Sequence, residues 1–359
     1  MTLKFYSNKV NYEVEQRYHL NTQAKAYWNE RSQEERRQVY GKWVDLYQYE
    51  PEISNADVCL LTYHWPYYIN QGRVAEAEAE VRAAKEAGKP MVVFSGSDYP
   101  ARMPFEDVIL FESAGYRSDQ GYRYHSAIPS FLNDYINEYC EGKLMLREKQ
   151  DMPVVGFCGQ AETNIMQTAW RSLRRTKRDL FYRLGLSKLE PPPFETTSLR
   201  AKVLKAFDKP GIQTNYLARK QYQAGKSDEM TSRSQEKVDF VNNVLGSDYT
   251  LCMRGGGNFS VRFYETLSLG RIPVFIDSDC LLPFQDVIDY KTIFPWVDMK
   301  ELPIAAEILL DFHSKLSNEE FKALQVTCRY LWFDHMTPDG FYRDLSLMMA
   351  RFREYENGR

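Results

Sequence analysis

Residues 249–276 read YTLCMRGGGNFSVRFYETLSLGRIPVFI, and this stretch decides the fold of the chain. It predicts a short apolar strand, a glycine loop, a helix that begins near Ser260, and a second apolar strand. Three consecutive glycines, Gly255, Gly256 and Gly257, let backbone N–H groups approach a ligand closely. The N-terminus of a helix adds partial positive charge at the same place. The unit therefore has the features of an anion-binding loop.

Charged side chains strengthen this interpretation. Arg254 at the strand end and Arg262 in the first helical turn carry forked donors that suit phosphate oxygens. Glu265 lies three residues after Arg262 on the same helical face and can accept hydrogen bonds from two vicinal sugar hydroxyls. A diphosphate flanked by a ribose fits such a group, so the sequence predicts a nucleotide-sugar donor site. Its predicted residues are Arg254, Gly255, Gly256, Gly257, Asn258, Phe259, Ser260, Arg262 and Glu265.

The spacing differs from the two common nucleotide motifs. The Gly-Lys-Ser/Thr ending of a Walker loop is absent, and the third glycine of the dinucleotide fingerprint is missing. A structural alternative stays open, in which the stretch is only a strand–loop–helix corner. In that case Gly270 simply ends the helix, and Arg262 and Glu265 form a surface ion pair.

The same residues resemble the exostosin family, glycosyltransferase family 47. The resemblance lies in RGGGNFSVRFYETL at 254–267 and GRIPVFI at 270–276, followed by LPF at 282–284, VIDY at 287–290 and Trp332. It covers residues 200–340 well and the N-terminal half only faintly. It implies an inverting glycosyltransferase, with a UDP-sugar as the favoured donor and a glycan as acceptor. Synthesis of a surface polysaccharide or a glycoprotein glycan is the setting that we expect.

Length and composition agree with a soluble two-domain enzyme. The 359 residues are long for one core, and 43% hydrophobic and 26% charged residues are ordinary for a globular protein. A net charge of −3 argues against nucleic acid as the main partner. Because no run of 18 apolar residues and no signal-peptide core is found, we expect a cytoplasmic enzyme without a membrane anchor. Six cysteines without CxxC spacing predict reduced core thiols.

The alternation of strand and helix signals predicts an α/β fold with parallel sheets. We expect a GT-B-like arrangement of two Rossmann-like domains that face a cleft. Residues 1–150 form the acceptor-binding domain, residues 151–340 the donor domain, and residues 341–359 a C-terminal helix that crosses back. The segment 23–49 is predicted to form one or two charged, aromatic-rich helices.

The first domain must supply the general base and the acceptor contacts. His64 and Asp98 each follow a predicted strand, so they lie at the sheet edge where ligands gather. Of the two, Asp98 is favoured as the base, since the adjacent Ser-Gly-Ser turn lets it approach a hydroxyl. The predicted acceptor-binding aromatic residues, whose faces can stack on sugars, are Trp65, Tyr67 and Tyr68. Glu112 and His125 are weaker candidates, and a structural role stays open for each of these residues.

Two further features leave alternatives open. Asp277 and Asp279 match a DxD motif that can share a divalent ion, although capping of the loop by Asp277 is the simpler interpretation. A basic helix includes Arg171, Arg174, Arg175, Lys177, Arg178 and Arg183. Three roles stay open for this helix: it binds an anionic acceptor, it contacts a membrane surface peripherally, or it faces only solvent.

We therefore expect an inverting glycosyltransferase in which the arginines and loop amides stabilise the leaving diphosphate without a metal or another cofactor. One alternative is another GT-B enzyme, such as a GDP-fucose-type transferase or a nucleotide-sugar epimerase. The other is a non-catalytic subunit that binds a glycan or a nucleotide.

Overall fold

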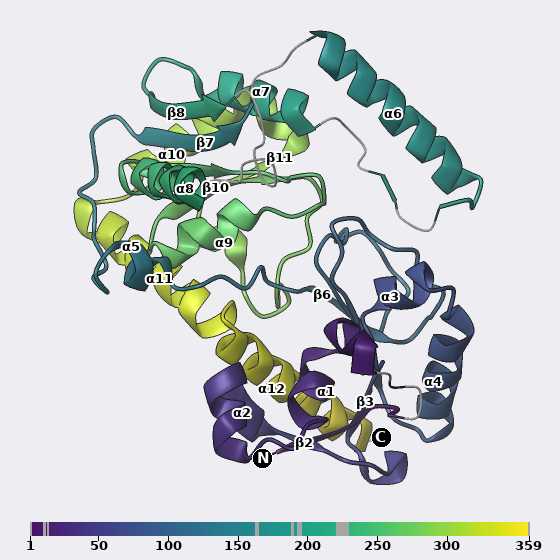
Figure 1. Ribbon diagram of the computed structural model, residues 1–359. Coiled ribbons are helices and arrows are strands. Elements are labelled where there is room, and N and C mark those ends of the chain that lie inside the picture. Colours follow the sequence, from purple (N-terminus) through teal and green to yellow (C-terminus); the bar gives the residue numbers. More distant parts are fainter. Residues whose placement is uncertain are drawn as a thin grey trace.

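The computed structural model describes residues 2–9, 12, 14–161, 165–187, 190–191, 196–219 and 230–357. The chain forms two lobes, each built on its own parallel sheet, and a long C-terminal helix runs from one lobe into the other (Figure 1). The predicted fold class, α/β with two Rossmann-like lobes of the GT-B type, is confirmed by this architecture.

The first lobe contains a sheet with the strand order β2-β1-β3-β4-β5-β6. Its strands are β1 (Leu3–Tyr6), β2 (Tyr47–Tyr49), β3 (Val58–Leu60), β4 (Met91–Ser95), β5 (Ile109–Glu112) and β6 (Tyr124–Ala127). Its helices are α1 (Thr22–Tyr27), α2 (Gln33–Tyr40), α3 (Trp65–Asn70) and α4 (Val74–Glu86), with 3-10 turns at Val14–His19, Lys42–Leu46 and Ile53–Asn55. Every residue of β4 and β5 is buried, as expected for central strands of a sheet that helices cover on both faces.

The second lobe contains a sheet with the order β11-β10-β9-β7-β8. Its strands are β7 (Val154–Gln160), β8 (Gln213–Arg219), β9 (Tyr249–Cys252), β10 (Ile272–Asp277) and β11 (Trp296–Asp298). Its helices are α5 (Tyr135–Tyr139), α6 (Ile165–Arg183), α7 (Thr196–Phe207), α8 (Met230–Leu245), α9 (Val261–Ser268), α10 (Ala305–Ser314) and α11 (Asn318–His335), with 3-10 turns at Tyr290–Thr292 and Met299–Ile304. The central strands β9 and β10 are buried throughout.

One secondary-structure prediction is wrong. The segment 23–49 is not helical to its end, because Tyr47–Tyr49 forms strand β2 beside β1, with Leu3 opposite Tyr47. The Tyr47 hydroxyl donates a hydrogen bond to the backbone carbonyl of Tyr342 at 2.6 Å. Both contacts join residues far apart in the sequence, so local periodicity could not reveal the strand.

The chain passes between the lobes twice. Helix α5 packs in the second lobe, where Tyr135 and Ile136 join a core cluster with Phe240 and Val244. The expected boundary at residue 150 therefore falls inside the second lobe. Helix α12 (Pro338–Asn357) returns to the first lobe, where its apolar side joins the core of the first sheet.

The six cysteines are buried and unbridged, as the sequence predicts. Within the described parts of the chain, every helix is too short or too polar to span a lipid bilayer.

Candidate active site

The stretch at 249–276 folds as predicted, with β9, a glycine loop, α9 and then β10. Strands β9 and β10 are parallel neighbours in the sheet, and Ser260 is the N-cap residue of α9. Gly270 follows the C-cap with a φ of 63°, which a glycine adopts without strain. The loop turns on a hydrogen bond from the Gly255 N–H to the Phe259 carbonyl at 2.9 Å. The glycine loop thus lies at the carboxyl edge of the second sheet.

Arg254 is buried at the base of this loop, with 2% of its surface exposed. Its Nη1 donates to Asn258 Oδ1 at 2.9 Å and reaches the Tyr116 hydroxyl of the first lobe at 3.5 Å. The guanidinium group lies 5.8 Å from the centre of the Tyr116 ring. These contacts hold the guanidinium group at the base of the glycine loop, beside the first lobe.

Arg262 lies at the start of α9 and is held by neutral groups. Its Nη2 donates to the Cys158 carbonyl, and its guanidinium group lies 4.7 Å from the centre of the Phe157 ring. A Cβ atom at Gly159 would lie 2.6 Å from this Nη2, so a glycine at the end of β7 is required for the contact. Arg254 thus follows β9, and Arg262 reaches from α9 to the end of the adjacent strand β7.

Glu265 does not form the surface ion pair with Arg262 that the structural alternative requires. Its Oε1 instead accepts from Lys237 Nζ at 2.7 Å and from the Tyr135 hydroxyl at 2.9 Å, and 12% of its side chain is exposed. A carboxylate has about four lone-pair sites, so about two stay available for ribose hydroxyls. The contacts fix the carboxylate in place.

Two cations near this loop were missed by the sequence reasoning. Lys237 comes from α8, and Arg200 of α7 donates to the Gln160 carbonyl at 3.3 Å. The nearest neighbour of a Cβ atom at Gly255 would be Arg200 Nη2, at 3.9 Å. Both residues lie outside the stretch 249–276, and no local motif marks them.

The glycine loop touches the first lobe directly. A Cβ atom at Gly257 would lie 2.1 Å from the Asp98 carbonyl oxygen, and one at Gly256 would lie 3.6 Å from the Tyr99 hydroxyl. Asp98 follows β4 and its side chain is exposed. The structure therefore brings the favoured base candidate next to the predicted donor loop.

A second contact between the lobes uses the DxD segment. Arg117 of the first lobe forms an ion pair with Asp277 at 2.7 Å, and Asp277 Oδ1 accepts from the Cys280 N–H at 2.9 Å, which is the loop capping considered above. Asn258 donates to the backbone carbonyls of Gly115 and Asp279, each at 3.0 Å. Beside this contact is a hollow of about 500 Å³ lined from both lobes, by Arg117, Asp277, Ser278, Asp279, Lys291, Asp298, Met299 and Lys300.

Burial makes His64 a weaker base than an ordinary histidine. Burial lowers its pKa to about 4, and the nearby cations Lys25 and His19 add to this effect. An imidazole with so low a pKa is neutral but weakly basic. It lines a hollow of about 320 Å³ with Tyr18, His19 and Gly96, among others.

The three predicted acceptor-binding aromatic residues are largely buried in the first lobe. Trp65, Tyr67 and Tyr68 are at most 3% exposed. The Trp65 indole donates to the Arg102 carbonyl at 3.2 Å, and the Tyr67 hydroxyl accepts from Arg73 at 2.6 Å. Tyr67 also lines the hollow of about 320 Å³ that contains His64.

The weaker candidates Glu112 and His125 form a buried pair. The Nε2 atom of His125 lies 2.8 Å from Glu112 Oε1. Burial raises the pKa of Asp119, and the Glu112 carboxylate raises it further. Burial likewise raises the pKa of Glu190, whereas Arg254 lowers it. A group of carboxylates thus gathers near Arg254.

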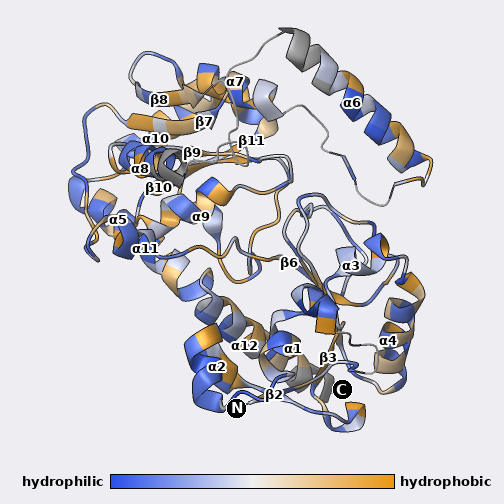
Figure 2. Ribbon diagram, viewed as in Figure 1, coloured by the Kyte–Doolittle hydropathy of each residue, from blue (hydrophilic) through white to orange (hydrophobic). Residues whose placement is uncertain are grey.

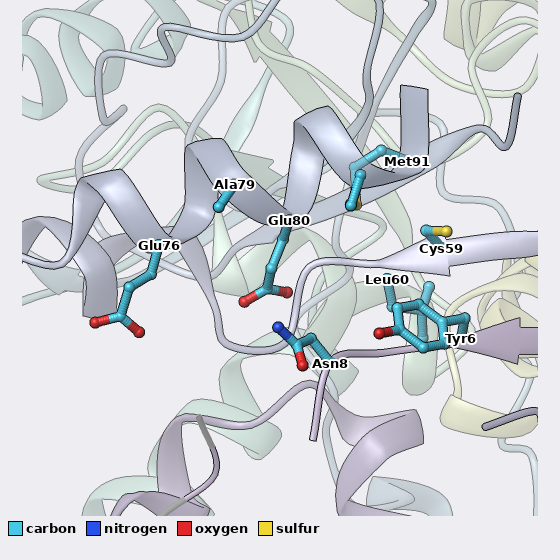
Figure 3. A pocket seen from close by; sticks show the side chains of 9 residues that line it. Tyr6, Asn8, Cys59, Leu60, Glu76, Ala79, Glu80 and Met91 are labelled. Carbon is cyan, nitrogen blue, oxygen red and sulfur yellow. The ribbon is translucent and has the colours of Figure 1, made fainter. Parts of the chain in front are cut away.

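A small cavity of about 100 Å³ lies beside α4 in the first lobe (Figure 3). The Glu80 carboxylate at this cavity accepts from the Thr62 N–H at 3.0 Å, the Thr62 hydroxyl at 2.8 Å and the Tyr68 hydroxyl at 2.9 Å. Burial raises the pKa of Glu80 to about 7. All residues that line this cavity belong to the first lobe, so the hydrogen bonds of Glu80 stabilise that lobe and not the glycine loop.

Comparison with known proteins finds a family match that lies mostly in the second lobe. The family model described as the Exostosin GT47 domain matches residues 137–311, which confirms the resemblance inferred from the sequence. Exostosin-1 from Drosophila melanogaster is 29% identical over 113 residues, or 32% of this chain and 14% of that protein. Probable glucuronosyltransferase 47 A from Physcomitrium patens is 39% identical over 76 residues, or 21% of this chain and 17% of that protein.

The matched region is a small part of these proteins, since this chain spans less than a quarter of the length of the curated relatives it matches. Among solved structures, the GtfA/B complex aligns with a TM-score of 0.35 and 12% identity, over 83% of this chain and 58% of that chain.

Proposed function

We propose that this chain, which carries an exostosin GT47 domain at residues 137–311, is an inverting glycosyltransferase. It transfers a sugar from a uridine diphosphate donor to a hydroxyl group of a glycan. The observation that carries the proposal is the pair of arginines, Arg254 and Arg262, which flank a glycine loop at the sheet edge next to the first lobe. The glycosyltransferase names of the relatives support the same reaction class.

In the proposed donor site, the diphosphate lies against the glycine-loop amides, with the two guanidinium groups on its oxygens. Glu265, fixed by Lys237 and Tyr135, accepts hydrogen bonds from the ribose. Charge develops on the leaving diphosphate as its bond to the sugar breaks, so preorganised cations lower the barrier. Asp277 already binds Arg117 and caps its own loop, which favours a reaction that needs no metal at this position.

The first lobe supplies the base in this proposal. Asp98 takes the proton from the acceptor hydroxyl, whose oxygen attacks the anomeric carbon as the bond to the diphosphate breaks on the opposite face. Attack from that face inverts the anomeric configuration. Asp98 is preferred because its backbone contacts the donor loop and its side chain is exposed. Glu112, paired with His125 and buried, is the second candidate.

The test is a donor screen with purified protein. Uridine, guanosine and cytidine diphosphate sugars are each incubated with glycan acceptors in EDTA, and the released nucleoside diphosphate is measured. We expect release from a uridine diphosphate sugar that depends on the acceptor and is lost in Arg254→Ala.

Other results of the screen would replace the proposal. Release from a guanosine donor alone would favour the GDP-fucose-type alternative. Conversion of the donor sugar without an acceptor would favour an epimerase, and tight binding without any turnover would favour a non-catalytic subunit. Loss of activity in EDTA with rescue by manganese would assign the DxD segment to a metal.

A further inference from the structure

Helix α6 has an exposed apolar side. Trp170 is 60% exposed, Leu173 63% and Leu184 62%. Together with Leu180 and Phe181, which are also exposed, they recur at helical spacing and so form one stripe. The helix lies apart from both sheets in Figure 1, and Figure 2 shows hydrophobic and hydrophilic residues alternating along it.

The polar side of α6 faces the protein instead. Arg178 lies 4.4 Å from the centre of the Tyr99 ring, and Arg102 lies 4.8 Å from the centre of the Tyr182 ring. Loop 99–102 of the first lobe thus holds the polar side of the helix. A helix at the surface of a globular protein usually turns its apolar stripe inward, so this reversed orientation points to a partner outside the chain.

Positive charges border the stripe. Arg174 and Arg183 are exposed on its two sides, and Lys177 lies within it, with Nζ 5.6 Å from the centre of the Phe181 ring. The long stem of a lysine adds to an apolar surface while its ammonium group reaches the polar boundary. The one acidic residue of α6 is Asp179, which pairs with Arg183 at 2.8 Å and is half-buried.

We propose that α6 docks the protein on the surface of an anionic lipid bilayer. The apolar stripe enters the boundary between headgroups and acyl chains, and Arg174, Lys177 and Arg183 bind acidic headgroups. A second copy of the chain is a poorer occupant, because a symmetric contact would bring the same cations of both copies together. The proposal stands on the geometry of α6 and does not depend on sugar transfer.

The test is co-sedimentation of the full chain with two kinds of vesicles, phosphatidylcholine alone and phosphatidylcholine mixed with phosphatidylglycerol. We expect binding to the anionic vesicles, weakened by salt, and little binding to the neutral ones. The double variant Leu173→Glu/Leu184→Glu should lower the partition coefficient by about tenfold or more, and Arg174→Glu/Lys177→Glu should lower it by a similar factor.

The matched control is Val39→Glu/Leu347→Glu, which changes residues of α2 and α12 that are 55% and 53% exposed. It should bind anionic vesicles like the unaltered chain. Equal binding by the Leu173→Glu/Leu184→Glu variant and the control would overturn the proposal, as would equal binding to neutral vesicles. Light scattering that shows a dimer, dissociated by Leu173→Glu/Leu184→Glu, would assign the stripe to a second copy and overturn it as well.

Discussion

The side chains proposed to act in the reaction differ between the two sheets, although both sheets are parallel and place these residues at their carboxyl edges. At the second sheet, Arg254 donates to Asn258 of the glycine loop, and Arg262 donates to the Cys158 carbonyl at the end of β7. At the first sheet, Asp98 and Glu112 follow β4 and β5. The fold brings these two edges together, and we propose different roles for the side chains on each of them. In the proposed reaction, the second-sheet edge binds the diphosphate and the first-sheet edge supplies the proton acceptor.

Removing the base should have the largest effect on the rate and so tests the anionic edge. Asp98→Asn is expected to lower kcat by about 10²–10⁴-fold, because the acceptor is no longer deprotonated, while the affinity for the nucleoside diphosphate stays nearly unchanged. Steady-state kinetics and calorimetry measure the two quantities.

Glu112→Gln is the companion variant, and it removes the charge of the buried pair with His125. A large loss of kcat in Glu112→Gln together with normal turnover in Asp98→Asn would move the base to Glu112. Normal turnover in both would remove the base from these two strands.

The contact between the two edges should be the next most sensitive feature. In Gly257→Ala the new methyl group would lie 2.1 Å from the Asp98 carbonyl oxygen, so the two edges must move apart. Since small displacements of reacting groups slow a reaction strongly, we expect a loss of about 10²-fold in kcat/KM. Gly256→Ala is the matched comparison, because its methyl group meets the Tyr99 hydroxyl at an ordinary 3.6 Å. Equal losses of kcat/KM in Gly257→Ala and Gly256→Ala would show that the contact between Gly257 and Asp98 does not control the rate.

Stability should respond to pH through the first lobe. Glu80 has no cation among its hydrogen-bonding partners in the described residues, whereas the buried Asp248 of the second lobe pairs with Arg147 at 2.5 Å. Burial raises the pKa of Glu80 from 4.5 to about 7, so the folded state binds the proton more tightly than the unfolded state. The stability that this group contributes is therefore present below pH 4.5 and is lost as the pH rises to about 7.

The variant Glu80→Gln keeps the neutral form at every pH. Relative to this variant, the free energy of unfolding of the unaltered chain should fall by on the order of 3 kcal/mol between these limits. Denaturant titrations at several pH values measure the difference. Parallel pH profiles for the two proteins would contradict the assignment to Glu80.

How much the sequence predicts differs between the lobes for a physical reason. The donor unit lies within 28 consecutive residues, so its strand, loop and helix could be inferred from local glycines, arginines and periodicity. The first-lobe site is assembled from distant segments, and its contacts leave no local pattern. Burial of Trp65 and Tyr68 depends on packing beneath the loop at 99–105, which the sequence around them does not reveal.

The same reason explains other differences. Strand β2 forms because it pairs with β1, which lies more than forty residues earlier in the sequence. The ion pair of Asp277 likewise needs Arg117, which comes from the other lobe. Arg200 and Lys237 reach the site from α7 and α8, which lie outside the stretch 249–276. Long-range pairing and helix rotation are set by the tertiary structure, so they become visible only in the folded chain.

The central claim is that the second lobe binds a nucleoside diphosphate through its two arginines. Calorimetry of uridine diphosphate with the unaltered chain, Arg254→Ala, Arg262→Ala and the surface control Arg37→Ala tests it most directly. We predict binding to the unaltered chain and the control, weakened by about 1.5–3 kcal/mol in each of the two site variants. Unchanged affinity in both site variants, with their folding verified by thermal denaturation, would contradict the account.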